Sequence, residues 1–411
     1  MSGKSELVLF GESNPPQVVV EQGIFCDINP VSGVEGPTIE FIINGSHNEY
    51  LDLNDTILYL KLKVVKAADG SKLDAGSKAY TSNYLMNALF KDVSLSLNNK
   101  VVEGGSLLEY PYKATIESIF NFNEDARRLQ LLPTGFSDET EERAKWIAES
   151  QMFELCGALR LNFLNQPKYL LPNVDVKILL DKNKDSFSLI LEAGDAAKIV
   201  IHRAVLYVRK VKVSPAVQLG HQVGLLKQNA IYPYTKSTIV SNVIPTGSLS
   251  YTKDNLFIHT LLPKFIVVCM VKGSAYNGSY EQDPFYFDHF KVHSVGLYRD
   301  GQSLPYREIY EPDFEKGLYT REYVMSIVQN TEHLNTNLNN GISMADFKKG
   351  YTFFTFNLTP DFCMNDTQRP TTGNLRLDIK FRASTVEPIN VLAYGIFDGQ
   401  VQITKDREII I

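Results

Sequence analysis

The sequence predicts an all-β protein that consists of two tandem antiparallel β-sandwiches. Many short stretches alternate apolar and polar residues with a period of two, which buries one face of a strand and leaves the other in water. Turn dipeptides such as Asn-Gly, Asn-Asn and Asp-Gly separate these stretches. The same order of elements then occurs twice along 411 residues, a length that exceeds one ordinary hydrophobic core.

In the first half, the alternation is clearest at residues 57–65, where leucine and valine interleave with isoleucine, tyrosine and lysine. A strand at residues 38–43 precedes Asn44-Gly45, and this pair predicts a turn because both residues tolerate positive φ. Apolar residues near helical spacing predict helices at residues 110–122 and 139–149. Further strands are predicted at residues 91–97, 101–102, 153–163, 174–180 and 198–213.

The second half repeats this plan at an offset of roughly 200 residues. Residues 90–97 and 290–297 hold equivalent places, since each is a strand followed by a turn, a helix, a strand pair and a final long hairpin. The helix is predicted at residues 319–329, and Asp398-Gly399 is predicted to be the turn of the last hairpin. The strands are predicted at residues 232–243, 255–270, 290–298, 352–358, 374–383, 390–397 and 400–404.

Two antiparallel units with many strands, long inserts and a short helix favour two jelly rolls. An immunoglobulin-like sandwich is the alternative, but each unit is about twice the ~100 residues typical of that fold. We place the jelly rolls at residues 31–217 and 218–404. Residues 1–30 are expected to form an N-terminal arm, and residues 405–411 a C-terminal tail.

Composition and charge restrict the function. The net charge of −6 argues against a protein that holds nucleic acid mainly through its phosphates. The N-terminus has no long apolar region typical of a signal peptide, and the most apolar run, residues 261–271, is too short to span a bilayer. We therefore expect a soluble protein made inside a cell. Reduced thiols are expected because the cysteines are scattered, at Cys26, Cys156, Cys269 and Cys363.

Motifs typical of enzymes are missing from the sequence, including GxGxxG after a strand, a Walker A loop, a GxSxG elbow and HExxH. His289 and His293 lie on an alternating stretch, where their spacing places both on one strand face without implying a metal site. The basic residues among positions 203–212 alternate with valine and predict a charged outer sheet face. We expect no catalytic residue, cofactor or metal, and hence a binding or structural role.

One acidic, aromatic region keeps two other functions open. Residues 276–287 could form a shallow aromatic site of a tandem β-sandwich that binds carbohydrate or protein without assembling a shell. Paired carboxylates in the same region could instead belong to a glycoside hydrolase, although we favour a solvated loop. The carboxylates concerned are Asp283, Asp288, Asp300 and Asp313.

The sequence resembles the double jelly-roll major capsid proteins of Polintons (Mavericks) and adintoviruses, relatives of which are integrated in animal genomes. The likeness is strongest over residues 5–123, in SELVLF, GPTIEFIINGSHNEYLDLNDTILYLKLKV and LFKDVSLSLNNKVVEGGSLLEYPYKATIESIFNF. Fainter similarity occurs in KIVIHRAVLYVRKVKVSP at residues 198–215 and in GYTFFTFNLTPDF at residues 350–362.

The resemblance implies a homotrimer that forms a pseudo-hexagonal capsomer and tiles an icosahedral shell around double-stranded DNA, without a basic tail. It also implies a single jelly-roll penton or minor capsid protein as partner, location in the virion, and no stable insertion into a membrane. We expect inter-subunit contacts in the arm, in the insert at residues 273–284 and in the tail. The candidate contact residues are Val18, Val19, Val20, Tyr276, Tyr280, Ile409, Ile410 and Ile411.

Overall fold

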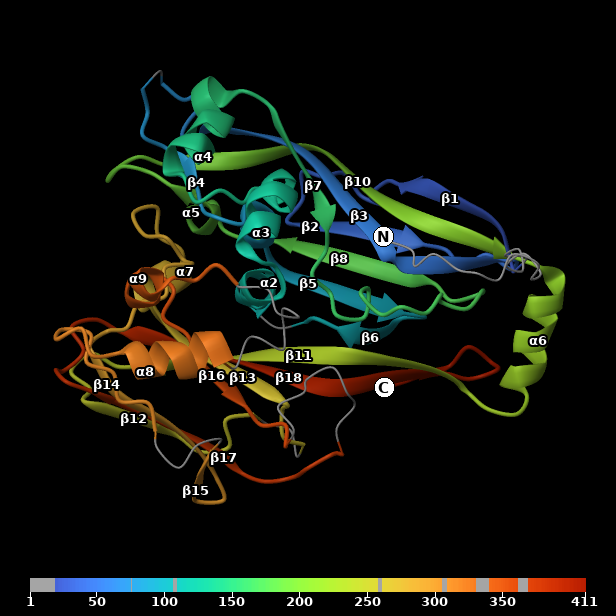
Figure 1. The fold of residues 1–411 in the computed structure, drawn as a ribbon. Coiled ribbons are helices and arrows are strands. Elements are labelled where there is room, and N and C mark those ends of the chain that lie inside the picture. The colour runs from blue at the N-terminus through green and yellow to red at the C-terminus, as the bar shows by residue number, and fades with distance from the viewer. Residues whose placement is uncertain are drawn as a thin grey trace, which may run out of the picture.

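The computed structural model describes residues 19–74, 76–105, 109–257, 261–304, 309–329, 340–360 and 369–411. Two β-sandwiches lie side by side, one built from the first half of the chain and one from the second (Figure 1). Helix α6 (Pro215–Leu225) joins them at one end of the molecule.

The first sandwich consists of two four-stranded antiparallel sheets. One has the order β1-β10-β3-β7, from β1 (Val20–Ile28), β10 (Ala197–Val213), β3 (Glu49–Lys66) and β7 (Phe153–Ala158). The other has the order β2-β8-β5-β6, from β2 (Thr38–Ile43), β8 (Val176–Lys182), β5 (Phe90–Leu97) and β6 (Lys100–Glu103). Two short strands pair separately, β4 (Tyr80–Thr81) and β9 (Leu189–Ile190).

The second sandwich has the same construction. One sheet has the order β11-β18-β13-β16, from β11 (Ala230–Ile244), β18 (Ile389–Ile403), β13 (Phe265–Lys272) and β16 (Phe354–Asn357). The other has the order β12-β17-β14-β15, from β12 (Ser250–Lys253), β17 (Leu375–Phe381), β14 (Val292–Arg299) and β15 (Gln302–Leu304). A short last strand, β19 (Ile409–Ile410), pairs with β18.

The two sandwiches correspond strand for strand. We number the strands of each sandwich from one to eight along the chain, leaving out β4 and β9 of the first. In each sandwich, one sheet then holds the first, eighth, third and sixth strands. The other sheet holds the second, seventh, fourth and fifth, and this is the jelly-roll arrangement. The prediction of two tandem jelly rolls is therefore confirmed. Asn98-Asn99 and Asp300-Gly301, all at positive φ, make the equivalent hairpin turns β5–β6 and β14–β15.

Helices fill the connections at the end of the molecule opposite α6 (Figure 1). The predicted helices are present as α2 (Glu109–Asn121), α4 (Thr140–Ile147) and the pair α8 (Thr320–Tyr323) and η3 (Val324–Gln329). The sequence did not predict α6, because Ser214-Pro215 suggested a chain break, whereas proline is well tolerated in the first helical turn. The remaining helices are α1 (Leu85–Ala88), α3 (Glu124–Gln130), α5 (Asp185–Ser188), α7 (Gly273–Asn277), α9 (Met344–Lys348), η1 (Leu132–Thr134) and η2 (Ala148–Ser150).

Helix α2 belongs to the first half but packs between the two sandwiches, against β5 on one side and β11 on the other. Its residues Tyr112, Ile116 and Phe120 share one hydrophobic cluster with the core of the second sandwich. Strand β13 is buried at every position except Lys272, since both faces of its sheet are covered. Apolar packing therefore extends from the core of the second sandwich to α2 of the first half.

The predicted hairpin at Asp398-Gly399 is wrong. Strand β18 runs without interruption through both residues and pairs with β11 along its whole length, with Asp398 opposite Thr235 and Gly399 opposite Tyr234. Neither residue has positive φ. A partner strand of equal length satisfies the backbone here, so the Asp-Gly pair stays extended.

The two chain ends also differ from the expected arm and tail. Residues 20–28 form the edge strand β1, which pairs with β10 of the same chain, so only the residues before β1 precede the first jelly roll. Ile409 is 3% exposed and lies in the core of the first sandwich. The boundary placed at residues 217 and 218 falls inside α6. The domain limits otherwise stay a prediction.

Gly45 is required for close packing and not for the positive φ that the sequence suggested. Its φ is not positive, and a Cβ atom there would lie 2.6 Å from the backbone nitrogen of Val174. Its N–H donates to Asp175 Oδ1 at 2.7 Å. The residue therefore fixes the connection from β2 to β3, which lie in different sheets.

We expect Gly45→Ala to destabilise the protein by about 1–3 kcal/mol, because backbone and not a flexible side chain opposes the added methyl group. Gly33→Ala is the matched control, since nothing lies within 4 Å of its Cβ position and its φ is not positive. The control should stay within about 0.5 kcal/mol of the parent protein in urea unfolding. Equal effects of the two substitutions would contradict the packing argument.

Candidate functional site

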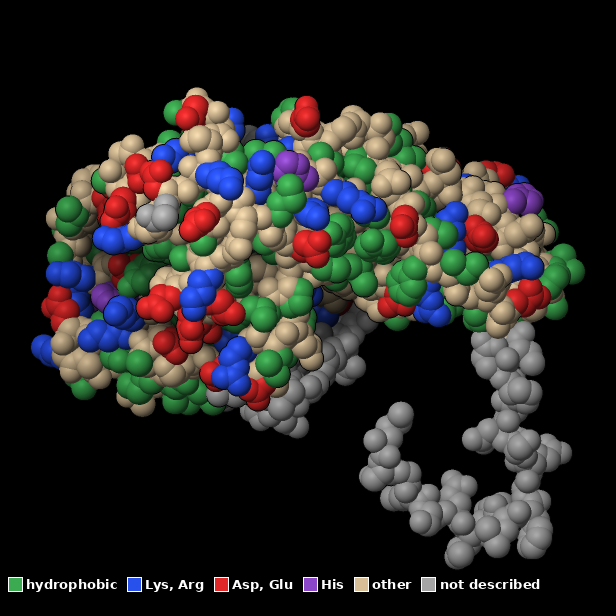
Figure 2. Space-filling model, turned by 90° about the horizontal axis from the view of Figure 1, so that it is seen from above, with side chains coloured by type: hydrophobic (Ala, Val, Ile, Leu, Met, Phe, Trp, Pro, Cys, Tyr) green, Lys and Arg blue, Asp and Glu red, His purple; other side chains and the backbone are tan. Residues whose placement is uncertain are grey.

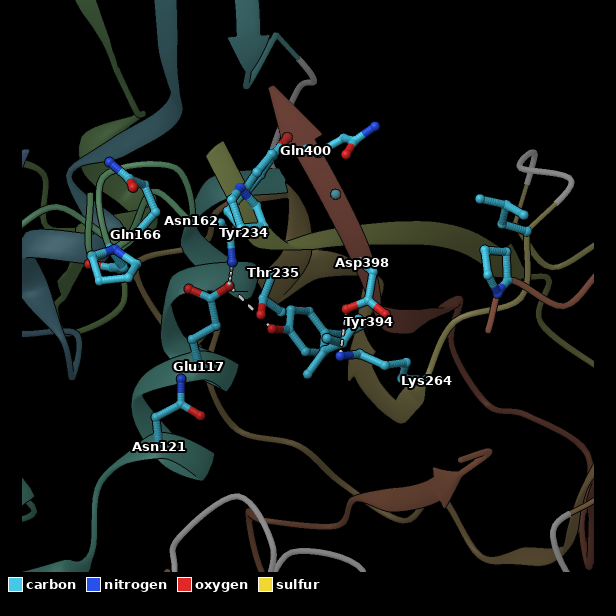
Figure 3. Close-up of a pocket in the computed structure, with 17 residues that line it drawn as sticks. Glu117, Asn121, Asn162, Gln166, Tyr234, Thr235, Lys264, Tyr394, Asp398 and Gln400 are labelled. Atoms are coloured by element: carbon cyan, nitrogen blue, oxygen red, sulfur yellow. Dashed lines mark hydrogen bonds and ion pairs between the residues drawn. The ribbon is translucent and has the colours of Figure 1, made fainter. Parts of the chain in front are cut away.

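A cleft of about 800 Å³ lies where the two sandwiches meet (Figure 3). Helix α2 contributes Glu117 and Asn121, and the segment after β7 contributes Asn162 and Gln166. The second sandwich contributes Tyr234 and Thr235 of β11, Tyr394, Asp398 and Gln400 of β18, and Lys264. The cleft is therefore lined by amides, hydroxyls and charged groups from both halves of the chain.

Glu117 is 6% exposed and joins the two halves through hydrogen bonds. Its Oε1 accepts from Ser237 Oγ at 2.6 Å and from the Tyr394 hydroxyl at 3.2 Å, both in the second sandwich. It also accepts from Asn162 Nδ2 at 3.3 Å. A buried carboxylate with several donors is well satisfied.

Lys113, one turn before Glu117 on α2, is 4% exposed and supplies the positive charge of this network. Its ammonium donates to Glu103 Oε1 and lies 3.8 Å from Glu117 Oε1. Burial lowers the pKa of Lys113, but Glu103 and Glu117 together outweigh burial, so its pKa is raised well above the ordinary value. Glu103 also accepts from the N–H groups of Asn162 at 2.9 Å and Phe163 at 3.0 Å.

The geometry of the cleft suits attachment of one sandwich to the other better than proton transfer. Asp398 pairs with Lys264 at 2.6 Å, on the other side of the Tyr394 ring from Glu117 (Figure 3). Each carboxylate is thus already bound by donors of its own chain, whereas a catalytic acid and base must reach a substrate. No group of three His, Cys, Asp or Glu side chains in the described residues could hold a metal ion.

The two histidines of the sequence analysis have separate structural surroundings. The His289 ring stacks on Phe314 with centroids 4.3 Å apart, and burial lowers its pKa. Its Nδ1 accepts from the N–H of Lys291 at 3.0 Å. His293 is exposed on β14.

The four aspartates of the acidic region support local structure. Asp283, Asp288 and Asp300 accept from backbone N–H groups at 2.7–3.0 Å, and Asp313 pairs with Arg382 at 3.4 Å. Of the aromatic residues around them, Phe285 and Phe287 are buried, whereas Tyr286 is 41% exposed. The shallow aromatic site at residues 276–287 stays a prediction.

Most of the candidate contact residues in the insert and tail have partners within the chain. Tyr276 stacks on Tyr112 with ring centroids 5.4 Å apart, and the Tyr280 hydroxyl donates to the Ala197 carbonyl at 2.8 Å. Of the tail, Ile409 is buried, while Ile410 is 41% and Ile411 50% exposed. Their roles between subunits stay predictions.

At the other end of the chain, Val18 lies outside the described residues. Val19 is 45% exposed and Val20 half-buried at the start of β1. Ile24 and Phe25 of the same strand are both about half exposed. The role of Val18, Val19 and Val20 between subunits also stays a prediction, but the structure leaves this edge strand accessible.

A second apolar surface was missed by the sequence analysis. Leu219, Val223 and Leu226 follow one face of α6 and are 62%, 46% and 73% exposed. Their helical spacing would have predicted an amphipathic helix if proline had been read as a helix start. Because these apolar side chains are exposed together on one helix face, the face is a candidate contact surface.

The outer face of the first sandwich has mixed charge. Figure 2 shows Lys and Arg side chains interspersed with Asp and Glu over this side of the molecule. Arg209 of β10 pairs with Asp52 and Asp55, both at 3.0 Å, and Lys210 pairs with Glu49 at 3.3 Å. The predicted charged outer face is present, and Arg209 and Lys210 on it are paired with acidic neighbours.

The thiols and helices give no sign of other chemistry. Cys26, Cys156 and Cys269 are free, and only Cys269 is buried, while Cys363 lies outside the described residues. Among the described helices, none combines the length and apolar character needed to cross a membrane.

These observations define the class of fold as a double jelly roll, two jelly rolls in one chain. A chain of the Sputnik virophage structure matches with a TM-score of 0.67 at 12% identity, over 100% of this chain and 92% of that one. The Faustovirus major capsid protein matches with a TM-score of 0.61 at 10% identity, over 97% and 93%. The latter is a structural protein and not an enzyme. At these identities the likeness shows the fold.

In sequence, the chain is 25% identical over 368 residues to an uncharacterised protein of Caenorhabditis elegans. The match covers 84% of this chain and 86% of the relative. No protein-family model matches the sequence.

Proposed function

We propose that this chain is a major capsid protein whose trimers tile an icosahedral shell around double-stranded DNA. The observation that carries the proposal is the strand-for-strand duplication of the jelly roll within one chain. Three such chains around a three-fold axis present six similar sandwiches, which gives a pseudo-hexagonal building block for a closed shell. The likeness to a viral major capsid protein supports the same function.

The sequence resemblance makes the proposal more specific. On this resemblance we propose a capsid protein of the Polinton and adintovirus type, and the nematode relative is compatible with such genes residing in animal genomes. The expected partners are further copies of the chain, a single jelly-roll penton or minor capsid protein, and the packaged DNA. The expected location is the virion, assembled inside the host cell.

The chemistry of the described surface agrees with a shell subunit. Arg209, Lys210 and Lys212 of β10 are paired with acids of the same sheet, which favours a structural role of this face over binding of DNA. The apolar face of α6 and the exposed edge of β1 are surfaces that neighbours could cover. The hydrogen bonds and ion pairs that line the cleft between the sandwiches would hold the two jelly rolls of one subunit together.

The mass of the purified protein in solution tests the proposal. We expect light scattering to give three times the 46.3 kDa of one chain, and negative-stain images to show closed shells under some conditions of salt and pH. Monomers that never assemble would overturn the proposal and favour the alternative, a tandem β-sandwich that binds carbohydrate or protein.

Deletion of the residues before β1 separates trimer formation from shell assembly. Removing residues 1–18 leaves β1 and its pairing with β10 intact, so trimers should persist. Shells should form less readily, because the segment is expected to join neighbouring capsomers. Normal shells from the shortened chain would contradict this role of the arm.

A further inference from the structure

A second cavity, of about 440 Å³, lies between the sandwiches at the end of the molecule opposite α6. Its walls come from both halves of the chain. Arg127 of α3 and Arg143 of α4 belong to the first half, and Asp283 and residues 341–351 belong to the second. A ligand in this cavity would therefore contact both jelly rolls at once.

Two buried arginines line the cavity without an acidic partner. Arg127 is 5% and Arg143 4% exposed, yet neither has a carboxylate within ion-pair distance in the part of the chain that the structure describes. Arg143 donates to the Thr81 carbonyl at 2.6 Å and lies 5.3 Å from the centroid of the Tyr80 ring. These contacts orient its guanidinium but do not neutralise it.

Four donors of the cavity have no hydrogen-bond partner among the described residues. They are the Nε–H groups of Arg127 and Arg143, the hydroxyl of Tyr84 and the hydroxyl of Thr115, which is fully buried. Arg127 is also held against the second half, since a Cβ on Gly341 would lie 2.6 Å from its terminal nitrogen. Buried donors without partners are rare, because they lose their hydration on folding.

The acidic groups of the cavity lie mostly towards its mouth. Glu124 and Asp138 are exposed, and Asp346 accepts from Ser343 in the cap of α9. Loss of hydration raises the pKa of Asp138, whereas Arg127 and Arg143 both lower it, so both guanidinium groups lie near this carboxyl group. Lys349 adds a further exposed cation.

Asp283 is the acid deepest in the cavity, and it forms no ion pair within the described residues. It accepts from the N–H of Phe285 at 2.9 Å. Burial raises its pKa, and Arg143 opposes this change. With one such carboxyl beside two guanidinium groups, the floor of the cavity carries an excess of positive charge.

We propose that this cavity binds a small oxyanion of the phosphate type between Arg127, Arg143 and Thr115. A guanidinium group offers a planar pair of N–H donors that matches a tetrahedral oxyanion, and Thr115 offers a third donor. The acidic mouth disfavours a long polyanion such as nucleic acid, so a small free ion fits better than a DNA phosphate. The inference does not depend on shell assembly.

The experiment compares the melting temperature of the full chain in sodium phosphate and in sodium chloride of equal ionic strength. We expect phosphate to raise the melting temperature of the parent protein by about 2–4 °C in a saturable manner. Sodium chloride should have a smaller effect without saturation. An equal rise in the two salts would overturn the proposal.

Matched variants locate the binding site. Arg127→Met and Thr115→Val should abolish or reduce the phosphate shift at least threefold, whereas Arg128→Gln should keep it, because Arg128 is exposed on the same helix. Thr115→Val preserves the side-chain shape, so it tests the site even if Arg127→Met fails to fold. A full phosphate shift in Thr115→Val and in Arg143→Met would also overturn the proposal.

Discussion

Replacing Lys113 with methionine should destabilise the protein by about 3–5 kcal/mol, because it leaves Glu103 and Glu117 buried without their cation. Methionine keeps most of the volume of lysine, so the expected loss arises from charge and not from a cavity. The two carboxylates have little access to water, since the side chains of Glu103 and Glu117 are 11% and 6% exposed. Urea unfolding followed by circular dichroism would measure the change.

The control for this substitution is a lysine with the same kind of partner at the surface. Lys78 pairs with Glu192 at 2.8 Å, but the two side chains are 78% and 56% exposed. Lys78→Met should cost less than about 1 kcal/mol. A loss of similar size for Lys78→Met and Lys113→Met would show that burial is not the cause.

A double variant tests the charge balance of the buried network. Adding Glu117→Gln to Lys113→Met removes one of the two uncompensated charges and keeps an acceptor for Ser237 and Tyr394. The double variant should therefore be more stable than Lys113→Met alone. Because the pKa of Lys113 is raised, its contribution is present at neutral pH and is lost only as pH rises through that raised value.

Replacing Tyr112 with alanine should destabilise the protein by about 3–5 kcal/mol, whereas replacing it with phenylalanine should be neutral or slightly stabilising. The ring of Tyr112 is fully buried. It stacks on Tyr276 and meets Phe285 edge-on at 5.8 Å, so it attaches α2 to the second sandwich. Alanine would leave a large cavity at this junction.

The phenylalanine variant removes only the hydroxyl group. The Tyr112 hydroxyl is buried and has no hydrogen-bond partner in the described residues. Desolvation raises its pKa well above the ordinary value of tyrosine, as expected for a phenol in apolar surroundings. Thermal unfolding of the two variants side by side would measure the difference. A Tyr112→Phe variant as unstable as Tyr112→Ala would contradict the assignment of the ring as the stabilising part.

Similar turn signals in the sequence had different outcomes. Asn98-Asn99 and Asp300-Gly301 form hairpin turns as predicted, because the strands before and after each dipeptide pair with each other. Asp398-Gly399 has the same composition but lies within a continuous strand, because β11, more than 150 residues earlier, pairs along its full length. Local turn propensity is weak compared with a complete hydrogen-bond ladder.

The candidate site could be predicted less well than the fold. The sequence suggested a shallow aromatic site at residues 276–287. In the structure Phe285 and Phe287 are buried and Tyr276 is half-buried against Tyr112 of the other half, whereas Tyr286 is 41% exposed. Likewise, nothing near Lys113 in the sequence indicates that Ser237 and Tyr394 complete its network.

The sequence by itself determined where most of the strands lie, that they form two antiparallel units, and that those units follow the same order. Only the tertiary structure decided the strand pairing across long distances, the continuity of β18, and the burial of the aromatic and charged groups between the sandwiches. The physical reason is one of range. Alternation and turn propensity act over a few residues, whereas burial and register depend on partners that the chain brings together only when it folds.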